Sequence, residues 1–157
     1  MKTFKGASLI ILLIYTSTSI RWPLHTVCKN DHLELYYRSC DPLQDFAFSL
    51  DRCPAAVIHR INIRLATILR RSIIELFVDV SLNVNGKHVT VYSKQLCERN
   101  NPQYTFCGMK KGEYFYYEGP VSLGDHDIPQ GDFNVTVEFF NEDRRTIICA
   151  NFIIKSH

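Results

Sequence analysis

The stretch that decides the fold runs from Leu76 to Tyr92 and reads LFVDVSLNVNGKHVTVY. Every second residue of its first half, Leu76–Val84, is apolar, and the residues between them are mostly polar, which is the period of a strand with one buried face. Asn85-Gly86 follows, and this dipeptide is typical of the tight turn between antiparallel strands. Val89–Tyr92 then returns as a β-prone run. The stretch therefore predicts a β-hairpin.

Similar runs occur along most of the chain and, with the hairpin, make about eight strands. They are Leu33–Tyr37, Phe46–Leu50, Ile61–Leu65, Tyr114–Tyr117, Phe133–Phe139 and Thr146–Ile154. Gly, Pro, Asn and Asp separate them, and no alternation of strands with helices is present, which favours an all-β antiparallel sandwich or barrel. The segment 66–74 fits either a helix or a connection, because Arg70-Arg71-Ser72 interrupts the alternation.

The N-terminus has the features of a secretory signal peptide. Lys2 and Lys5 precede an apolar run, Ala7–Tyr15, which small polar residues follow. We expect residues 1–19 to be this leader and residues 20–157 to be one domain. The apolar run is about half the length that a membrane span needs, and no later segment is long enough. Cleavage of the leader removes Lys2 and Lys5 and lowers the formal net charge from +2 to zero. No run of consecutive Lys or Arg residues is longer than two, so we expect no nucleic-acid binding.

All six cysteines follow the expected leader, and a secreted chain favours disulfides between them. They contain no C-x-x-C spacing, which argues against a zinc site, and no metal site is expected. Six cysteines can pair in many ways, and spacing favours only the local loop between Cys97 and Cys107.

No catalytic motif stands out, so we expect neither an enzyme nor a cofactor. His126 lies between Asp125 and Asp127, but Gly124 and Pro129 nearby indicate an exposed loop. One modification motif is present: Asn134-Val135-Thr136 is an N-glycosylation sequon whose asparagine falls on the polar side of its strand.

Bulky apolar residues are abundant on the expected inner faces. A filled core and a sandwich opened around a ligand have the same alternation, so periodicity leaves both readings open.

Several motifs together carry a family resemblance. The segment Trp22–Cys28, the stretch Ser39–Phe46, Tyr104–Cys107, Lys111-Gly112-Glu113 and Ile128–Gly131 resemble the ML lipid-recognition family over essentially the whole mature chain. The resemblance implies an immunoglobulin-like β-sandwich whose two sheets splay into a lipid-binding cup. It also implies the disulfides Cys28 to Cys53, Cys40 to Cys149 and Cys97 to Cys107.

The same resemblance implies a secreted co-receptor that modulates innate immune responses to lipopolysaccharide. The implied partner is a leucine-rich-repeat Toll-like-receptor homologue of B cells, which holds the protein at the cell surface. The implied receptor-contact residues are Glu98, Arg99, Gln103 and Lys111. The residues implied to line the lipid cavity are Phe46, Phe48, Ile63, Leu65, Val78, Val80, Leu82, Tyr104, Phe115, Val121, Ile128, Phe133, Val137, Ile148, Phe152 and Ile154.

The loop that matches the cup mouth departs from the family's endotoxin-presenting members, in which it is lysine-rich. Here Gly124–Asp132 contains three acidic residues and no lysine. Charge-assisted contacts to lipid A phosphates would be missing, so we expect weak lipid A binding at most and a phospholipid or similar amphiphile as ligand. Ile128, at the loop apex, matches a mobile apolar position, and its small side chain predicts a weak ligand-dependent switch.

A second function fits the same motifs. A disulfide-stabilised secreted signalling protein or receptor chaperone with a solid core would act only through its surface.

Overall fold

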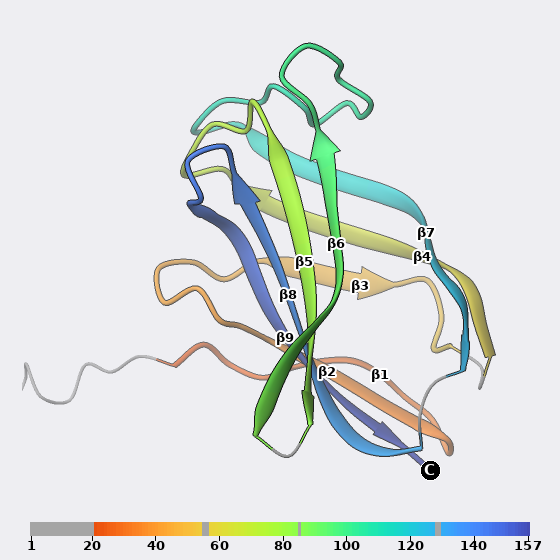
Figure 1. Ribbon diagram of the computed structural model, residues 1–157. Helices are drawn as coiled ribbons and strands as arrows, with labels where there is room; N and C mark the ends of the chain where they lie inside the picture. Colours follow the sequence, from red (N-terminus) through yellow and green to blue (C-terminus); the bar gives the residue numbers. More distant parts are fainter. Residues whose placement is uncertain (1–20, 55–56, 85, 128–129) are drawn as a thin grey trace, which may run out of the picture.

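The fold consists of nine β-strands in the parts of the chain that the structure, a computed structural model, describes: residues 21–54, 57–84, 86–127 and 130–157 (Figure 1). No helix occurs in those parts. The strands are β1 (His25–Lys29), β2 (Leu33–Ser39), β3 (Ala47–Leu50), β4 (Val57–Ile68), β5 (Leu76–Val84), β6 (Lys87–Cys97), β7 (Tyr114–Asp127), β8 (Gly131–Asn141) and β9 (Thr146–Ser156).

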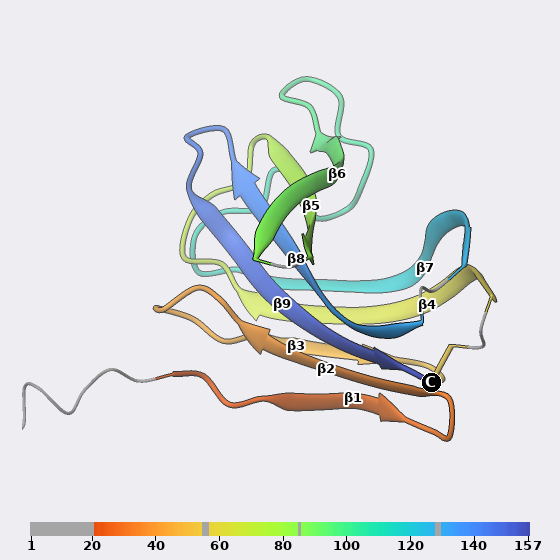
Figure 2. The ribbon, with the colours of Figure 1, turned by 60° about the horizontal axis from the view of Figure 1, so that its bottom comes forward.

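The strands form two antiparallel sheets, which confirms the predicted all-β sandwich. The larger sheet has the order β1-β2-β9-β8-β5-β6, and the smaller one has the order β3-β4-β7. Figure 1 shows the smaller sheet running across the larger one, and Figure 2 shows it lying against one face of β8 and β9. Among the described strands, the backbones of the two sheets approach closely only between β1 and β3.

The predicted hairpin is present. The strand β5 has the bounds expected from its alternation and pairs with β6. The turn glycine, Gly86, has a φ of 76°, a left-handed conformation that glycine adopts without the Cβ clash of other residues. The register shifts twice along β6, leaving Val91 and Leu96 without a partner on β5. Residues 55–56, 85 and 128–129 lie outside the described residues, and so does the leader expected at 1–19.

Two strands differ clearly from the expectations, and the segment 66–74 follows one of its two expected alternatives. The strand β1 was not predicted, because its five residues, HTVCK, are too short and too mixed to show a clear alternation. The segment 66–74 is not helical: β4 continues to Ile68, and a connection follows. The strand β7 extends to Asp127 despite its glycines, so His126 lies in a strand and pairs with Ile58 of β4, whereas an exposed loop was expected.

One end of the sandwich is closed by the connections that meet there. Leu69, Ile73, Leu76 and Cys97 are the most deeply buried large side chains, and all lie at this end. The β6–β7 connection pairs with the β4–β5 connection through the backbone, for example from Gly112 N to the Leu69 carbonyl (2.7 Å) and from Ile73 N to the Met109 carbonyl (3.0 Å). These bonds satisfy backbone groups that burial would otherwise leave unpaired. We call this the closed end.

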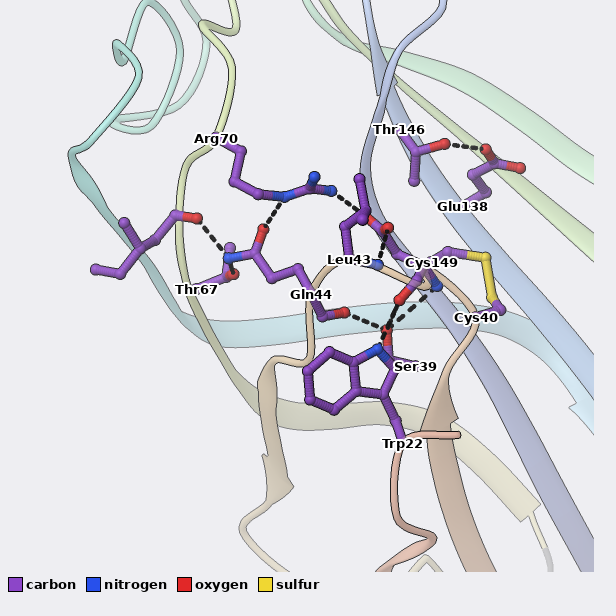
Figure 3. Close-up of polar contacts among 12 residues, drawn as sticks. Trp22, Ser39, Cys40, Leu43, Gln44, Thr67, Arg70, Glu138, Thr146 and Cys149 are labelled. Atoms are coloured by element: carbon purple, nitrogen blue, oxygen red, sulfur yellow. Dashed lines mark hydrogen bonds and ion pairs between the residues drawn. A yellow bond between two sulfur atoms is a disulfide. The ribbon is translucent and has the colours of Figure 1, made fainter. Parts of the chain in front are cut away.

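A polar network holds the β2–β3 connection to the same end (Figure 3). Gln44 Nε2 donates to Thr67 Oγ1 (2.8 Å) and to the Ile68 carbonyl (2.6 Å), which joins the connection to β4. Arg70 Nε donates to Gln44 Oε1 (2.7 Å), and the Arg70 guanidinium is paired with the buried carboxylate of Asp41. The network thus links the larger sheet's β2 to the smaller sheet's β4.

Three disulfides cross-link the sandwich, with the pairing that the family resemblance implies. Cys40–Cys149 joins the residue after β2 to the neighbouring strand β9, and Cys97–Cys107 closes a loop within the β6–β7 connection. Cys28–Cys53 joins β1 to the segment after β3, so it ties the edges of the two sheets together.

Candidate functional site

The apolar faces of the two sheets oppose each other, and the strand register identifies which residues lie on them. Residues directly opposite on antiparallel strands project to the same face. In the larger sheet, Val80 of β5 lies opposite Val137 of β8, and Val135 of β8 lies opposite Phe152 of β9. Phe152 in turn lies opposite Tyr37 of β2. The inner face is therefore an apolar surface that runs across four strands.

The smaller sheet presents a matching surface. Leu65 of β4 lies between Phe48 of β3 and Tyr117 of β7, and Ile61 lies opposite Val121. The rings of Phe48 and Phe152, from opposite sheets, meet edge to face with their centroids 5.1 Å apart. The two surfaces therefore pack directly on each other in the middle of the sandwich.

Burial falls along the inner faces of β5 and β9 with distance from the closed end, whereas Leu33 at the far end of β2 stays buried. On β5, Leu76 and Val78 are buried, whereas Val80 and Leu82 are only half-buried. On β9, Ile148 and Ala150 are buried, whereas Phe152 and Ile154 are half-buried.

The smaller sheet follows the same trend: on β4, Leu65 is buried, and Ile63 and Ile61 are half-buried. Inner side chains that keep contact with solvent indicate that the sheets separate there. We call this end of the sandwich, at the β5–β6 turn, the open end.

The residues expected to line a lipid cavity fall into groups. Five are core residues: Phe46, Leu65, Val78, Phe115 and Ile148. Nine others are half-buried on the inner faces, from the middle of the sandwich toward the open end: Phe48, Ile63, Val80, Leu82, Val121, Phe133, Val137, Phe152 and Ile154. Ile128 lies outside the described residues.

Tyr104 does not join this group. It lies in the β6–β7 connection at the closed end and is 37% exposed. Its ring stacks on Phe106 with the centroids 5.1 Å apart, so it covers the core from outside.

The lining set implied by the family resemblance left out other members of the inner surface. Leu35 of β2 lies opposite Ile154, Leu50 of β3 lies opposite Ile63, and Phe139 of β8 lies opposite Val78. Alternation in the sequence already places Leu50, Val135 and Phe139 on the apolar faces of their strands, whereas the place of Leu35 follows from its register with Ile154.

The expected receptor-contact residues lie in the β6–β7 connection and are exposed. Arg99 forms an ion pair with Glu75 (3.5 Å), and Glu98 forms an isolated bridge with Asn101. Lys111 lies on the turn that pairs with Leu69. Glu98, Arg99, Gln103 and Lys111 therefore share the closed end, opposite to the half-buried apolar surface.

The described residues contain no cluster of His, Cys, Asp or Glu that is suited to a metal ion. The inner surface carries one polar group of note, the Tyr37 hydroxyl, whose pKa burial raises above its usual value. The chemistry that this surface offers is burial of apolar chains, which contributes about 0.8 kcal/mol for each methylene group removed from water. No helix long and apolar enough to cross a membrane occurs in the described parts of the chain.

Comparison with known proteins identifies the class. The ML domain family matches residues 34–156, and the chain belongs to this family. Lymphocyte antigen 86 of chicken (Gallus gallus) is 50% identical over 157 residues, which cover 100% of this chain and 98% of that protein. The human (Homo sapiens) lymphocyte antigen 86 is 43% identical and covers 98% of each chain.

A solved structure supports the same assignment. The crystal structure of chicken MD-1 complexed with lipid IVa has a TM-score of 0.80 and 53% identity, and the match covers 87% of this chain and 99% of that one. The expected ML resemblance is thereby confirmed over the described domain.

Proposed function

We propose that the protein is a secreted lipid-binding co-receptor that holds acyl chains between its two sheets and performs no catalysis. The half-buried apolar surface at the open end carries this proposal. In a filled sandwich, Val80, Leu82, Phe152 and Ile154 would be as buried as Leu76 and Ile148. The complex of the related chicken MD-1 with lipid IVa gives independent support for a lipid as the ligand.

The ligand is proposed to be a phospholipid or similar amphiphile, held mainly by its acyl chains. Gly124–Asp132 contains three acidic residues and no lysine, which disfavours extra phosphate groups at the mouth. Lipid A should therefore bind more weakly than a phospholipid with chains of the same length. The lipid IVa complex of the relative makes this comparison of affinities the sharpest test of ligand class.

The proposed partner is a leucine-rich-repeat Toll-like-receptor homologue of B cells, and the proposed outcome is modulation of responses to lipopolysaccharide. The similarity to lymphocyte antigen 86 supports this partner. Contact through Glu98, Arg99, Gln103 and Lys111 would place the receptor at the closed end, where it leaves the open end free for lipid. Secretion through a leader at residues 1–19 would bring the protein to the cell surface with its receptor.

A glycan at Asn134 is part of the proposal. Asn134 is exposed on the outer face of the larger sheet, so a glycan there would not obstruct the space between the sheets. Enzymatic deglycosylation of the secreted protein should lower its mass by one glycan, and Asn134→Gln should abolish this difference. An unchanged mass after deglycosylation would contradict the assignment.

Native mass spectrometry of the secreted protein tests the main proposal. We expect a lipid at near-unit stoichiometry, which solvent extraction releases for identification. Delipidated protein should then take up a diacyl phospholipid in preference to lipid A. A lipid-free mass together with no uptake of added phospholipid would contradict the proposal and support a solid-core protein that acts through its surface.

A further inference from the structure

A pocket lies at the closed end, away from the proposed lipid site. It is an open surface depression with a volume of about 650 Å³ and is lined by Arg70, Arg71, Ser72, Lys111, Asn141, Asp143 and Arg145. We call it the basic pocket, because four of its seven lining residues are cationic.

The cations of the basic pocket come from three different connections. Arg71 follows β4, Lys111 precedes β7, and Arg145 lies in the β8–β9 turn. Backbone and side-chain bonds fix these connections to one another: Gly112 N donates to the Leu69 carbonyl (2.7 Å), and Asn141 Nδ2 donates to the Ser72 carbonyl (3.0 Å). The cations are therefore held near one another before any ligand arrives, which reduces the entropic cost of binding.

Three of the four cations have no acidic partner in the described parts of the chain. Arg70 already has partners within the protein, since its guanidinium binds Asp41 and Gln44 (Figure 3). Arg71, Lys111 and Arg145 form no ion pair among the described residues. The Nε atom of Arg71 is buried without a hydrogen-bond partner, so the terminal nitrogens of its guanidinium are the groups that remain for a ligand in the pocket.

The remaining lining groups indicate what kind of anion fits. Asp143 contributes a carboxylate, and Ser72 contributes a hydroxyl. A carboxylate repels a second anion but accepts hydrogen bonds from sugar hydroxyls. Guanidinium groups bind the oxygens of sulfate and phosphate through paired N–H donors. A sugar unit that carries such an oxyanion satisfies both kinds of group, whereas an acidic peptide would place further carboxylates beside Asp143.

We propose that the basic pocket binds an anionic saccharide through its sulfate or phosphate ester groups. Arg71, Lys111 and Arg145 contact the ester oxygens, and Asp143 and Ser72 contact the sugar hydroxyls. This site is separate from the lipid site, so its occupation does not depend on the proposed lipid function. Lys111 is also a proposed receptor contact, so the site is tested on the protein without its receptor.

Calorimetric titration of the secreted protein, without receptor, tests the proposal. The probes are a sulfated heparin tetrasaccharide, a hyaluronan tetrasaccharide that has carboxylates but no sulfate, a glutamate tetrapeptide, and inorganic sulfate and phosphate. We expect one site for the heparin probe at low salt and binding at least about tenfold weaker for hyaluronan and the peptide. Sulfate and phosphate should compete for the site at higher concentrations, which identifies the ester group as the recognised feature.

Matched variants locate the site. Lys111→Gln and Arg145→Gln should each weaken heparin binding about tenfold, because each removes one charge-assisted bond. Lys110→Gln removes the same charge from the adjacent exposed residue that does not line the pocket, and it should change affinity less than about twofold. In the unmutated protein, the Arg71 Nε–H resonance should shift on titration, and this readout does not require a folded Arg71 variant.

Four results would overturn the proposal: no binding of the heparin probe, equal losses from Lys110→Gln and Lys111→Gln, an unshifted Arg71 resonance, or peptide binding as tight as that of heparin. The last result would assign the basic pocket to an acidic protein partner. If inorganic phosphate binds but the heparin probe does not, the pocket is a site for an inorganic anion and the proposal is wrong.

Discussion

The hydroxyl of Tyr37 links the two sheets through hydrogen bonds. It donates to the Phe46 carbonyl (2.9 Å) and accepts from Phe48 N (3.2 Å), while the rings of Tyr37 and Phe46 lie 5.0 Å apart. Tyr37 belongs to β2 of the larger sheet, and Phe48 belongs to the edge strand β3 of the smaller one. The bonds therefore pass through the interior between the sheets, where few other polar groups are present.

Removal of this hydroxyl should destabilise the fold. Tyr37→Phe keeps the ring but leaves a buried carbonyl and a backbone N–H without a partner, so we expect a loss of about 1–3 kcal/mol in the free energy of unfolding. Urea unfolding measures this loss in the free energy of unfolding. The control is Tyr92→Phe, since Tyr92 is 51% exposed, and it should change stability by less than about 0.5 kcal/mol. Equal midpoints for both variants would contradict the assigned role of Tyr37.

A charge placed on the inner face of the open end should prevent lipid binding. Leu82 is half-buried on the inner face of β5, and its neighbour Asn83 projects to the outer face. We expect Leu82→Glu to lower lipid occupancy at least about tenfold, because a carboxylate among acyl chains is costly. Asn83→Glu adds the same charge outside and should leave occupancy unchanged. Native mass spectrometry compares the two, with urea unfolding to verify that both are folded, and equal occupancy would argue against lipid between the sheets.

The disulfides should contribute unequally to stability. Cys40–Cys149 closes a loop with a sequence separation of 109, whereas the separation for Cys28–Cys53 is 25. Loop entropy in the unfolded state grows with the logarithm of loop length, so replacing Cys40 and Cys149 by alanine should cost about 1 kcal/mol more than replacing Cys28 and Cys53. Urea unfolding of the two purified double variants gives the difference. Equal losses would show that loop entropy does not set the order.

Acid should weaken the contacts of Glu34. The Lys29 ammonium (3.0 Å), the Tyr36 hydroxyl (2.9 Å) and His157 lower the pKa of this carboxyl from 4.5 to about 2. Because the pKa is lower in the folded state, the stabilisation is complete above the unfolded value and is lost as the pH falls from 4.5 towards 2.

The Glu34→Gln variant should therefore lose less stability than the unmutated protein between about pH 5 and pH 3. Urea midpoints at the two pH values test this, with the exposed Glu98→Gln as the control that keeps the full acid dependence. The same loss in Glu34→Gln as in the unmutated protein would contradict the assigned contacts.

Local pattern predicted the elements whose residues alternate strictly. The bounds of β5 follow from its alternation, since a half-buried strand needs apolar residues on one side only. The same reasoning failed for β1, which is a short edge strand stabilised by its pairing with β2 and by Cys28–Cys53. It also ended β7 too early, because pairing with the long strand β4 carries β7 past its glycines.

Other features depend on the assembled fold. Alternation assigned Val78 and Val80 to one face, but the difference in their burial depends on how far the opposite sheet extends above them. The basic pocket was not predicted, because Arg71, Lys111 and Arg145 are distant in sequence and meet only when three connections close one end.

The two register shifts in β6 have a consequence for the behaviour of the protein at high concentration. β6 is an edge strand of the larger sheet, and its apolar residues Val89, Val91 and Tyr92 are more than half exposed. A flat edge of this composition is a template for aggregation by strand addition. The bulges at Val91 and Leu96 interrupt the regular row of backbone donors and acceptors, which disfavours the addition of another strand along this edge.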